Sequence, residues 1–388
     1  MRAWLFVLVL STVPCNARAA DEAPADAWPM ARGTLAGTGR SAMRVRFPLQ
    51  EAWHRSFGKT AFEATPIVAN GTIYVGDLDG TFHALSLETG EPRWTFKGSA
   101  GFPAAAALST DPAIPLVVAG DAEGGVRAFD RGTGEVRWEH RTEGEISGGP
   151  TIMPTRDGLR VLVGSQDATL TCLDLADGMV VWTHTIADQI RCGPTVVEGI
   201  VLVAGCDGKL HLIDASTGNE TAAVPIDGPT GTTPASEGGR AFFGTEGGTF
   251  HAIDIVPPRE AWKAQSTAKG KSYRSSAAIS GGLAIVGSRG RAIESFATDD
   301  GAQRWRHPMR GRVDASPVIV HAGGEGGREA VIVGDSAGRI VAVDAATGAP
   351  IWEFDAGGDF AGGAAVADGR VVLANGDGTI WCFTPAAP

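Results

Sequence analysis

One eleven-residue phrase returns along the chain, and this repetition constrains the fold more than any other feature. It reads AVDAATGAPIW at 342–352, AFDRGTGEVRW at 128–138 and ALSLETGEPRW at 84–94. The tryptophans that end the phrase are 43 to 47 residues apart, with one gap of 80. They are Trp94, Trp138, Trp182, Trp262, Trp305 and Trp352. A fixed period of this length indicates repeated units that pack on their neighbours.

The gap of 80 residues hides one degenerate unit. LIDASTGNETA at 212–222 keeps the Asp, Thr and Gly of the phrase but has Ala222 where the tryptophan belongs. Ahead of each unit's third strand runs an apolar strand that ends near a Gly and an acidic turn, such as TIYVGDLDG, and there are eight such segments. Each unit therefore reads as four short strands joined by tight turns, which predicts the blades of a β-propeller.

The two ends of the repeat region complement each other. The last unit, GTIWCFTPAAP, stops after its third strand, whereas LQEAWHRSF at 49–57 precedes the first complete blade and carries Trp53. Pairing these segments closes the ring and removes an open sheet edge. The sequence thus predicts an all-β, eight-bladed propeller of four-stranded antiparallel blades over residues 49–388, closed by an N-terminal strand.

The residues before the propeller read as targeting and lead-in segments. Residues 1–20, with Arg2, an apolar run and ARA at 17–19, are predicted to be a cleaved signal peptide, followed by a lead-in over 21–48. Pro14 before Cys15 argues against a lipoprotein, and no later apolar run reaches the roughly 18 residues of a membrane span. We expect a soluble monomer in the periplasm or outside the cell. With 44 acidic against 33 basic residues, nucleic acid is not expected as a partner.

The repeated side chains have a structural interpretation. A large aromatic at the same place in each blade fills the seam between neighbouring blades, and its indole N–H needs a nearby carbonyl. The Asp and Thr side chains hydrogen-bond the turn, and the Gly takes a positive φ. The predicted docking residues are the six tryptophans above together with Trp53.

The motif Ala-x-Asp-x-x-Thr-Gly-x-x-x-Trp resembles the tryptophan-docking repeat of quinoprotein-like (PQQ-repeat) propellers. The resemblance covers nearly the whole mature chain, and WPMARGTLAGTGRS at 28–41 is similar to the lead-in of exported members. It implies one of two functions, because fold alone does not set function. One branch contains dehydrogenases of alcohols and sugars that depend on pyrroloquinoline quinone. The other contains non-catalytic scaffolds, among them the propeller subunit of the outer-membrane barrel-assembly machinery.

The cysteines separate these branches. The resemblance implies that the enzymes hold the quinone between a tryptophan and a disulfide of adjacent cysteines, with calcium on carboxylate and amide side chains. Here the mature cysteines, Cys172, Cys192, Cys206 and Cys382, are far apart. The eight histidines show no close pair at metal-ligand spacing. We therefore expect no catalytic residue, cofactor or metal, and predict a protein-binding scaffold of the cell envelope. A quinone-dependent dehydrogenase and a carbohydrate- or peptide-binding module are the alternatives.

Cys192 and Cys206 lie on strands that fold back at Glu198-Gly199, so their sulfurs reach a similar depth. In an exported protein this placement allows a disulfide. The alternative is two free thiols.

One face of the propeller is predicted to bind the partner. An apolar residue stands four positions before each Pro or Ala landmark of the innermost strands, Thr230 being the exception. The same face carries acidic turns, which Arg289 and Arg291 interrupt, and residues 259–312 hold eleven basic and four acidic residues. A basic, apolar sector of this kind favours an acidic or extended segment. The alternative is that the apolar residues only pack between blades. The predicted contact residues are Tyr273, Arg274, Arg289, Arg291, Phe62, Phe102 and Phe360.

Overall fold

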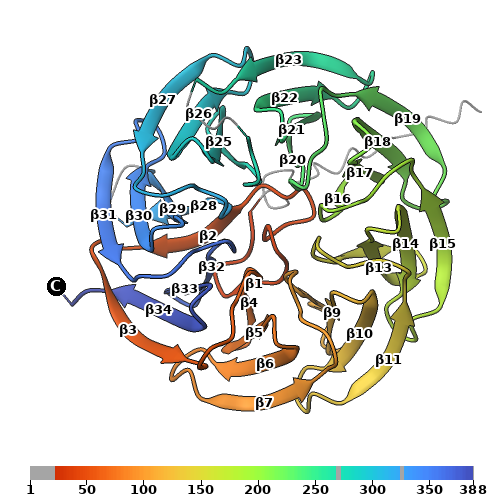
Figure 1. Cartoon of the computed structure of the whole chain (residues 1–388), viewed down its shortest axis with the longest axis horizontal. Helices are drawn as coiled ribbons and strands as arrows, with labels where there is room; N and C mark the ends of the chain where they lie inside the picture. Colours follow the sequence, from red (N-terminus) through yellow and green to blue (C-terminus); the bar gives the residue numbers. More distant parts are fainter. Residues whose placement is uncertain (1–21, 268–271, 324–326, 388) are drawn as a thin grey trace, which may run out of the picture.

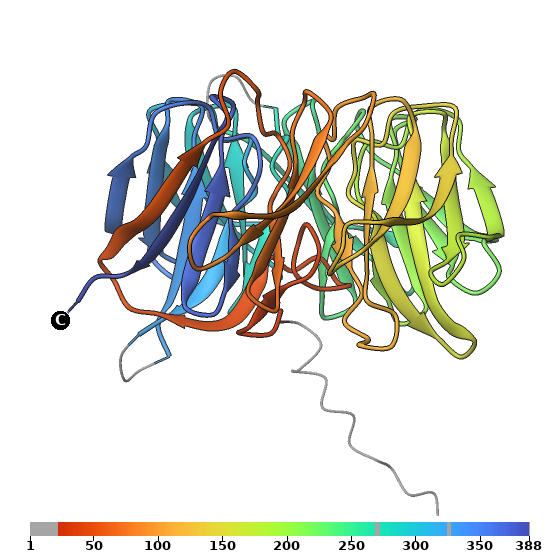
Figure 2. The same cartoon turned by 90° about the horizontal axis from the view of Figure 1, so that it is seen from below.

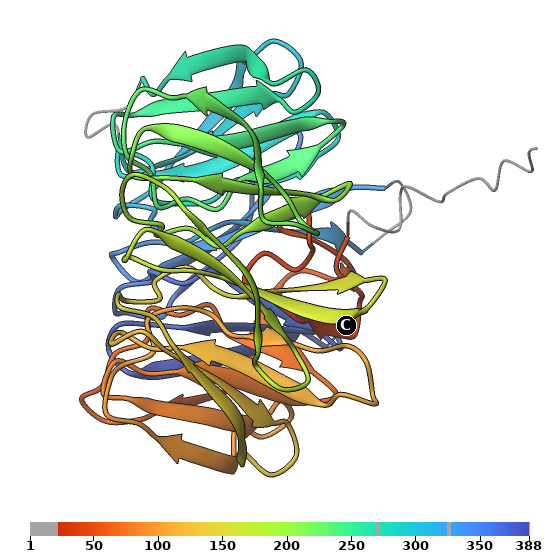
Figure 3. The same cartoon turned by 90° about the vertical axis from the view of Figure 1, so that its right-hand side faces the viewer.

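The computed structural model describes residues 22–267, 272–323 and 327–387, and within these ranges every regular element is a β-strand. Eight sheets stand around a common axis as the blades of a propeller (Figure 1). Seen from its edge, the molecule is a flat disc in which the blades stack side by side (Figure 3). The predicted fold is confirmed. No stretch of the described chain forms a helix long and apolar enough to cross a membrane. The predicted signal peptide, residues 1–20, lies outside the described residues.

Each blade runs from an inner to an outer strand, antiparallel throughout. Blades 1 to 4 comprise β4 (Ile67–Ala69), β5 (Thr72–Gly76), β6 (Thr81–Ser86) and β7 (Pro92–Lys97); β8 (Ala107–Leu108), β9 (Leu116–Gly120), β10 (Gly125–Asp130) and β11 (Val136–Arg141); β12 (Thr151–Thr155), β13 (Gly158–Gly164), β14 (Thr169–Asp174) and β15 (Val180–Thr185); β16 (Thr195–Val197), β17 (Ile200–Ala204), β18 (Lys209–Asp214) and β19 (Glu220–Pro225).

Blades 5 to 8 follow the same order, except that the last outer strand comes from the N-terminal side. They comprise β20 (Ala235–Glu237), β21 (Arg240–Gly244), β22 (Thr249–Asp254) and β23 (Arg259–Gln265); β24 (Ala278–Ser280), β25 (Leu283–Ser288), β26 (Ala292–Ala297) and β27 (Gln303–Pro308); β28 (Val318–Ala322), β29 (Glu329–Gly334), β30 (Arg339–Asp344) and β31 (Pro350–Asp355); β32 (Ala365–Ala367), β33 (Arg370–Ala374), β34 (Thr379–Pro385) and β3 (Leu49–Ser56).

The repeated phrase forms the turn between the third and fourth strands and docks it on the preceding blade. In blade 2, the Asp130 carboxylate accepts hydrogen bonds from the backbone N–H groups of Gly132 and Thr133 at 2.9 and 3.1 Å. Gly134 then takes a φ of 76°, and the Trp94 ring of blade 1 lies so close that a Cβ there would be 2.6 Å from it. The motif therefore needs glycine both for its conformation and for the approach of the ring.

Six seams repeat this contact with little variation. A Cβ on the motif glycine would lie 2.5 to 2.8 Å from the docked indole in every case. The indole N–H also donates to the carbonyl of the residue that follows the aspartate position of the motif. An example is the bond from Trp138 to Leu175 at 2.8 Å. The pairs are Trp53 with Gly90, Trp94 with Gly134, Trp138 with Gly178, Trp182 with Gly218, Trp262 with Gly301 and Trp305 with Gly348. Trp352 differs, because β34 has no such turn, and its ring meets Phe383 edge-on at 5.5 Å.

The fifth blade explains why blade 4 has lost its tryptophan. Four residues after Asp254, where the other turns have glycine, stands Pro258. Ala222 is the residue paired with Leu212 at the docking position, so the missing ring and the missing glycine face the same seam. The two departures from the motif compensate each other.

We therefore expect Ala222→Trp to destabilise the fold by about 1–3 kcal/mol, because the ring would overlap the side chain of Pro258. Guanidinium unfolding measures this free energy. The double variant Ala222→Trp with Pro258→Gly should recover part of the loss. A more stable Ala222→Trp single variant would show that the seam has room and would contradict this account.

The ring closes as predicted. β3 pairs antiparallel with β34, from Leu49 opposite Pro385 to Ser56 opposite Thr379. Its Trp53 then docks on blade 1, where the indole N–H donates to the Leu87 carbonyl at 3.1 Å. One strand thus joins the last blade to the first.

The lead-in has a larger role than the sequence indicated, because it lies inside the ring. β1 (Ala27–Trp28) adds to β4, and β2 (Arg40–Val45) runs parallel to β28. Between and around them the chain forms backbone hydrogen bonds with the inner strands of blades 2, 4, 5, 6 and 8. The lead-in is therefore hydrogen-bonded to seven of the eight blades. Figure 2 shows it in red toward one face of the disc, on the side of the hairpins between first and second strands.

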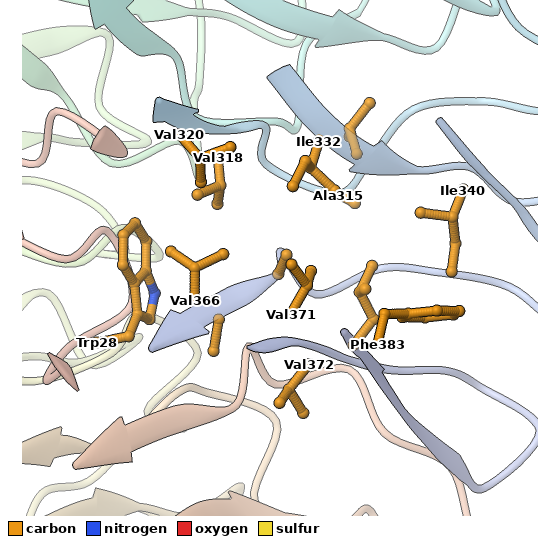
Figure 4. Packing of buried hydrophobic residues seen from close by; sticks show 14 of the residues in the cluster. Trp28, Ala315, Val318, Val320, Ile332, Ile340, Val366, Val371, Val372 and Phe383 are labelled. Carbon is orange, nitrogen blue, oxygen red and sulfur yellow. The ribbon is translucent and has the colours of Figure 1, made fainter. Parts of the chain in front are cut away.

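Apolar side chains fill the space between the blades and seal the lead-in into the ring. Trp28 is fully buried and packs near Val366 and Val318 of the neighbouring inner strands (Figure 4). Further out in the same cluster, Phe383 of β34 lies beside Ile340 of the preceding blade (Figure 4). The core is thus continuous from the lead-in to the closing blade.

Candidate functional site

The mouth of the central channel is built from one strand position repeated around the axis. Each inner strand is preceded by a buried residue that turns into a seam, apolar in every blade except at Thr230. The next residue turns toward the axis because side chains alternate along an extended chain. Eight such residues line the mouth, on the face opposite the lead-in. They are Glu63, Pro103, Ser147, Arg191, Gly231, Arg274, Asp314 and Ala361.

The mouth opens on a cavity of about 520 Å³ that continues into a narrower space of about 140 Å³. The narrower part is surrounded by small residues two positions further along each inner strand. These residues are bonded from blade to blade, as in Thr233 N–H to Ser276 Oγ at 2.9 Å and Ser276 N–H to Ser316 Oγ at 3.0 Å. The belt holds the inner strands at a fixed distance from the axis.

Arg32 of the lead-in forms the floor of the channel. Its Nη2 donates to the carbonyl oxygens of Ala277 and Pro317 at 2.8 and 2.9 Å, and the residue is only 4% exposed. Burial lowers the pKa of the Arg32 guanidinium to about 9, because the charged form loses its hydration. The channel is therefore closed at its narrow end by the Arg32 guanidinium.

The charges in the mouth are balanced rather than basic. Arg274 lies 3.6 Å from Glu246, and Arg289 and Arg312 lie 3.3 and 3.9 Å from Asp314. The same cavity is lined by Arg191, Glu63 and Asp359, which makes four basic and four acidic side chains.

The carboxylates of the mouth repel one another in places. Burial, followed by the nearby Asp314, raises the pKa of Asp359. Burial, followed by the nearby mouth residue Glu63, raises the pKa of Glu145, which lies outside the residues that line the cavity. The acidic side of the mouth is therefore the side on which a basic or neutral group would be accommodated.

The structure corrects part of the predicted contact surface. Phe62, Phe102, Phe360 and Tyr273 are fully buried, so no partner reaches them. Each fills a seam, and three of them lie against a strand-ending glycine of the preceding blade, where a Cβ would be 2.1 to 2.7 Å away. The Tyr273 hydroxyl donates to the buried Glu294 at 2.8 Å. The residues that face the channel are one position further along. Strand alternation separates the two sets of residues, but it does not say which set faces the axis.

The predicted arginines divide into two groups. Arg274 and Arg289 line the mouth, and their contact with a partner stays a prediction. Arg291 is exposed in the turn after β25 and lies outside the residues that line the cavity. The basic segment 259–312 is also spread over both faces, since Arg259 pairs with Asp254 in a turn of the opposite face. Residues 268–271 of that segment lie outside the described residues.

The acidic turns of this face are mostly structural. The Asp77 carboxylate accepts the Thr81 N–H at 2.7 Å and pairs with His83 at 2.9 Å. Asp335 is fully buried and accepts the N–H groups of Ala337 and Arg339. These carboxylates close the turns between second and third strands, so most of the predicted acidic series is not available to a partner.

The cysteine pair is not joined in the structure. Cys192 and Cys206 are both free thiols, Cys192 being buried. The Cys192 thiol donates to the Ala204 carbonyl at 3.5 Å, whereas the Cys206 thiol is directed to the Thr230 carbonyl at 3.8 Å. Burial raises the pKa of the Cys192 thiol to about 12, which makes it unreactive.

A second concave surface lies on the opposite face, between blades 3 and 4. This groove has a volume of about 770 Å³ and is lined in part by Met153, Arg156, Val181 and Glu198. At its edge, three consecutive apolar residues are exposed, one just before β15 and the first two of β15: Met179 by 68%, Val180 by 51% and Val181 by 46%. Exposed apolar surface beside a groove is typical of a protein-binding site. The only sequence signal for this surface is the run MVV at 179–181, which by pattern alone is typical of an ordinary strand.

Comparison with known proteins extends over the whole propeller. A family model described as "Outer membrane protein assembly factor BamB" matches residues 50–166, 122–218, 166–318 and 289–386. A protein of that name from Burkholderia pseudomallei is 30% identical over 161 residues, which are 39% of this chain and 39% of that protein. The match therefore spans well under half of that relative's length.

Solved structures share the fold at low identity. BamB from Moraxella catarrhalis superposes with a TM-score of 0.68 at 16% identity, over 87% of this chain and 100% of that one. Quinohemoprotein alcohol dehydrogenase from Comamonas testosteroni gives 0.74 at 14% identity, over 97% and 83%. A europium-containing methanol dehydrogenase gives 0.75 at 13%, over 95% and 99%. These likenesses show the propeller fold alone.

Proposed function

The chain belongs to the family described as outer membrane protein assembly factor BamB, and from this premise we propose that it is a non-catalytic scaffold of the cell envelope that binds other proteins during outer membrane protein assembly. The observation that carries the proposal is the family match, which runs from residue 50 to residue 386 and so includes all eight blades. The dehydrogenases share the architecture at 14% and 13% identity, a likeness that shows the fold alone.

The channel residues do not fit the quinone cofactor that the fold family implies. A quinone held between a tryptophan and a disulfide of adjacent cysteines needs an aromatic ring and paired sulfurs on the channel wall. Within the described chain, the residues that line the two channel spaces include neither tryptophan nor cysteine. Arg32 and the lead-in also fill the axis below the mouth. We therefore propose no step through a quinone.

The groove between blades 3 and 4 is the surface that we assign to a protein partner. β15 is an outer strand, so its free edge and its exposed Met179, Val180 and Val181 can pair with and cover a segment of another chain. The mouth of the channel is the less suitable surface, because its arginines and carboxylates already neutralise one another.

The function is tested by deleting the gene and measuring the amount of folded outer membrane β-barrel proteins. We expect the deletion to lower that amount and the full chain to restore it. Val180→Asp should fail to restore it while leaving the thermal unfolding midpoint unchanged, since Val180 is half exposed. Gln303→Asp, at the equivalent position of β27, is the matched control and should restore it fully.

The outcomes separate the function from the surface. Unchanged barrel proteins in the deletion strain would overturn the assembly role. Full restoration by Val180→Asp would keep that role and move the partner surface elsewhere. Dye reduction that depends on an alcohol or sugar, after addition of pyrroloquinoline quinone and calcium to the purified chain, would overturn the non-catalytic assignment.

A further inference from the structure

Two histidines and a glutamate meet across the seam between blades 3 and 4. His184 comes from β15, whereas His211 and Glu220 come from β18 and β19 of the next blade, and these strands are neighbours in Figure 1. One ligand atom from each residue lies within 4.8 Å of the other two. We name these three residues the seam cluster.

The distances in the seam cluster leave one histidine without a hydrogen bond to the glutamate. His211 Nδ1 lies 2.6 Å from Glu220 Oε2, but His184 Nε2 lies 3.8 Å from the same oxygen. The longer distance exceeds a hydrogen bond. It is close to the spacing of about 3.3 Å between two ligands that share a tetrahedral zinc ion at about 2.0–2.1 Å.

A buried carboxylate sets the tautomer of His211. Asp207 lies 3.1 Å from His211 Nε2, and both side chains are only 4% exposed. A Nε2–H that donates to Asp207 leaves the Nδ1 lone pair directed at the Glu220 carboxylate. Two lone pairs at 2.6 Å repel each other unless a proton lies between them, and a zinc ion that takes the place of this proton would move the two atoms to about 3.3 Å apart. Histidine ligands of zinc are commonly oriented by such an outer carboxylate.

The seam between blades 4 and 5 provides an internal comparison, because it has no second histidine and only a proton can lie between its histidine and its glutamate. His251 lies 3.0 Å from Asp227 and 3.1 Å from Glu260, so it repeats the contacts of His211. Strand register places Val224 in blade 4 where blade 3 has His184, since Leu210 pairs with Val224 as Leu170 pairs with His184. The second histidine is therefore what distinguishes the seam cluster from the triad of His251.

We propose that the seam cluster is a zinc site in which His184, His211 and Glu220 are the protein ligands and Asp207 holds His211. Two imidazoles and one carboxylate are a ligand set that zinc accepts, with a further position left for water. Glu220 is 37% exposed and His184 is 16% exposed, so the ion enters from solvent. The bound ion would fasten β15, which carries the partner surface, to blade 4. The site does not depend on the proposed function.

The test uses the purified chain, freed of metal with a chelator and titrated with zinc chloride at neutral pH. We expect one equivalent to bind and to raise the thermal unfolding midpoint. His184→Val reproduces the side chain of the neighbouring seam and should weaken zinc binding at least tenfold, while the unfolding midpoint of the metal-free protein stays near that of the wild type. Cobalt(II) provides a second readout, with visible absorption expected in the wild type and absent in His184→Val.

Glu220→Gln and Glu260→Gln form the matched pair if the histidine variant fails to fold. Both variants remove the negative charge of a glutamate that faces a seam histidine. Only Glu220→Gln should weaken zinc binding, again at least tenfold. The proposal is overturned if the wild type takes up no zinc, if His184→Val binds it as tightly as the wild type, or if the two glutamate variants weaken binding equally.

Discussion

A chain that begins at Gly58 is expected not to fold cooperatively as a monomer, whereas a chain that begins at Leu49 is expected to do so. The two differ only by β3 and its short continuation, yet β3 pairs with β34 along its whole length and docks Trp53 on blade 1. Without it, two blades lose their covalent and hydrogen-bonded link, and β34 becomes an open edge.

The expected loss between these two chains is about 5 kcal/mol or more in the free energy of unfolding, which is comparable with the whole stability of an ordinary domain. Size-exclusion chromatography and guanidinium unfolding measure it. Starting at Leu49 removes the lead-in as well, so this control separates ring closure from channel filling. Equal stability of the two chains would show that the blades hold together without closure.

Trp138→Ala is expected to destabilise the protein by about 3–5 kcal/mol, because it removes a large ring from a seam and leaves a cavity. Trp138 is 8% exposed, lies against Gly178 and donates to the Leu175 carbonyl at 2.8 Å. The midpoint of guanidinium unfolding, at unchanged slope, measures the effect.

Two control variants divide the cost of losing Trp138. Trp138→Phe keeps most of the ring but loses the indole donor, so it should cost about 1–3 kcal/mol. Arg137→Ala, at the exposed neighbouring position, removes only a surface ion pair with Asp130 and should cost under about 1 kcal/mol. If Trp138→Ala behaved like Arg137→Ala, the docking role of the tryptophan row would be wrong.

The fold could be predicted because the same local solution recurs with the same spacing. Each docking tryptophan, motif aspartate and motif glycine acts within one turn and one seam, so its role can be read from a short segment. Ring closure followed from counting strands, since β34 had no outer partner and the segment 49–57 had no blade. The sequence showed that blade 4 lacks its tryptophan. That Pro258 of blade 5 stands opposite the missing ring is visible only in the structure of the seam.

The functional surfaces were less predictable because they depend on direction and on distance across blades. Phe102 and Pro103 are adjacent in sequence, yet one fills a seam and the other lines the channel. The predicted contacts Phe62, Phe102 and Phe360 are the wrong members of such pairs, whereas Arg274 was predicted together with the buried Tyr273. Alternation alone does not say which side of a strand faces the axis. The exposed Met179 and its neighbours looked like ordinary strand residues.

The sequence by itself determined the number of blades, their order, the residues that dock them and the strand that closes the ring, because these features depend on local contacts repeated at one period. Only the tertiary structure decided what the ring encloses and what meets across its seams. Arg32 reaches its partners in blades 6 and 7 only when the ring is closed around it. His184 and Glu220 become neighbours only when two blades pack. Such contacts join segments with no shared period, so no pattern in the sequence reveals them.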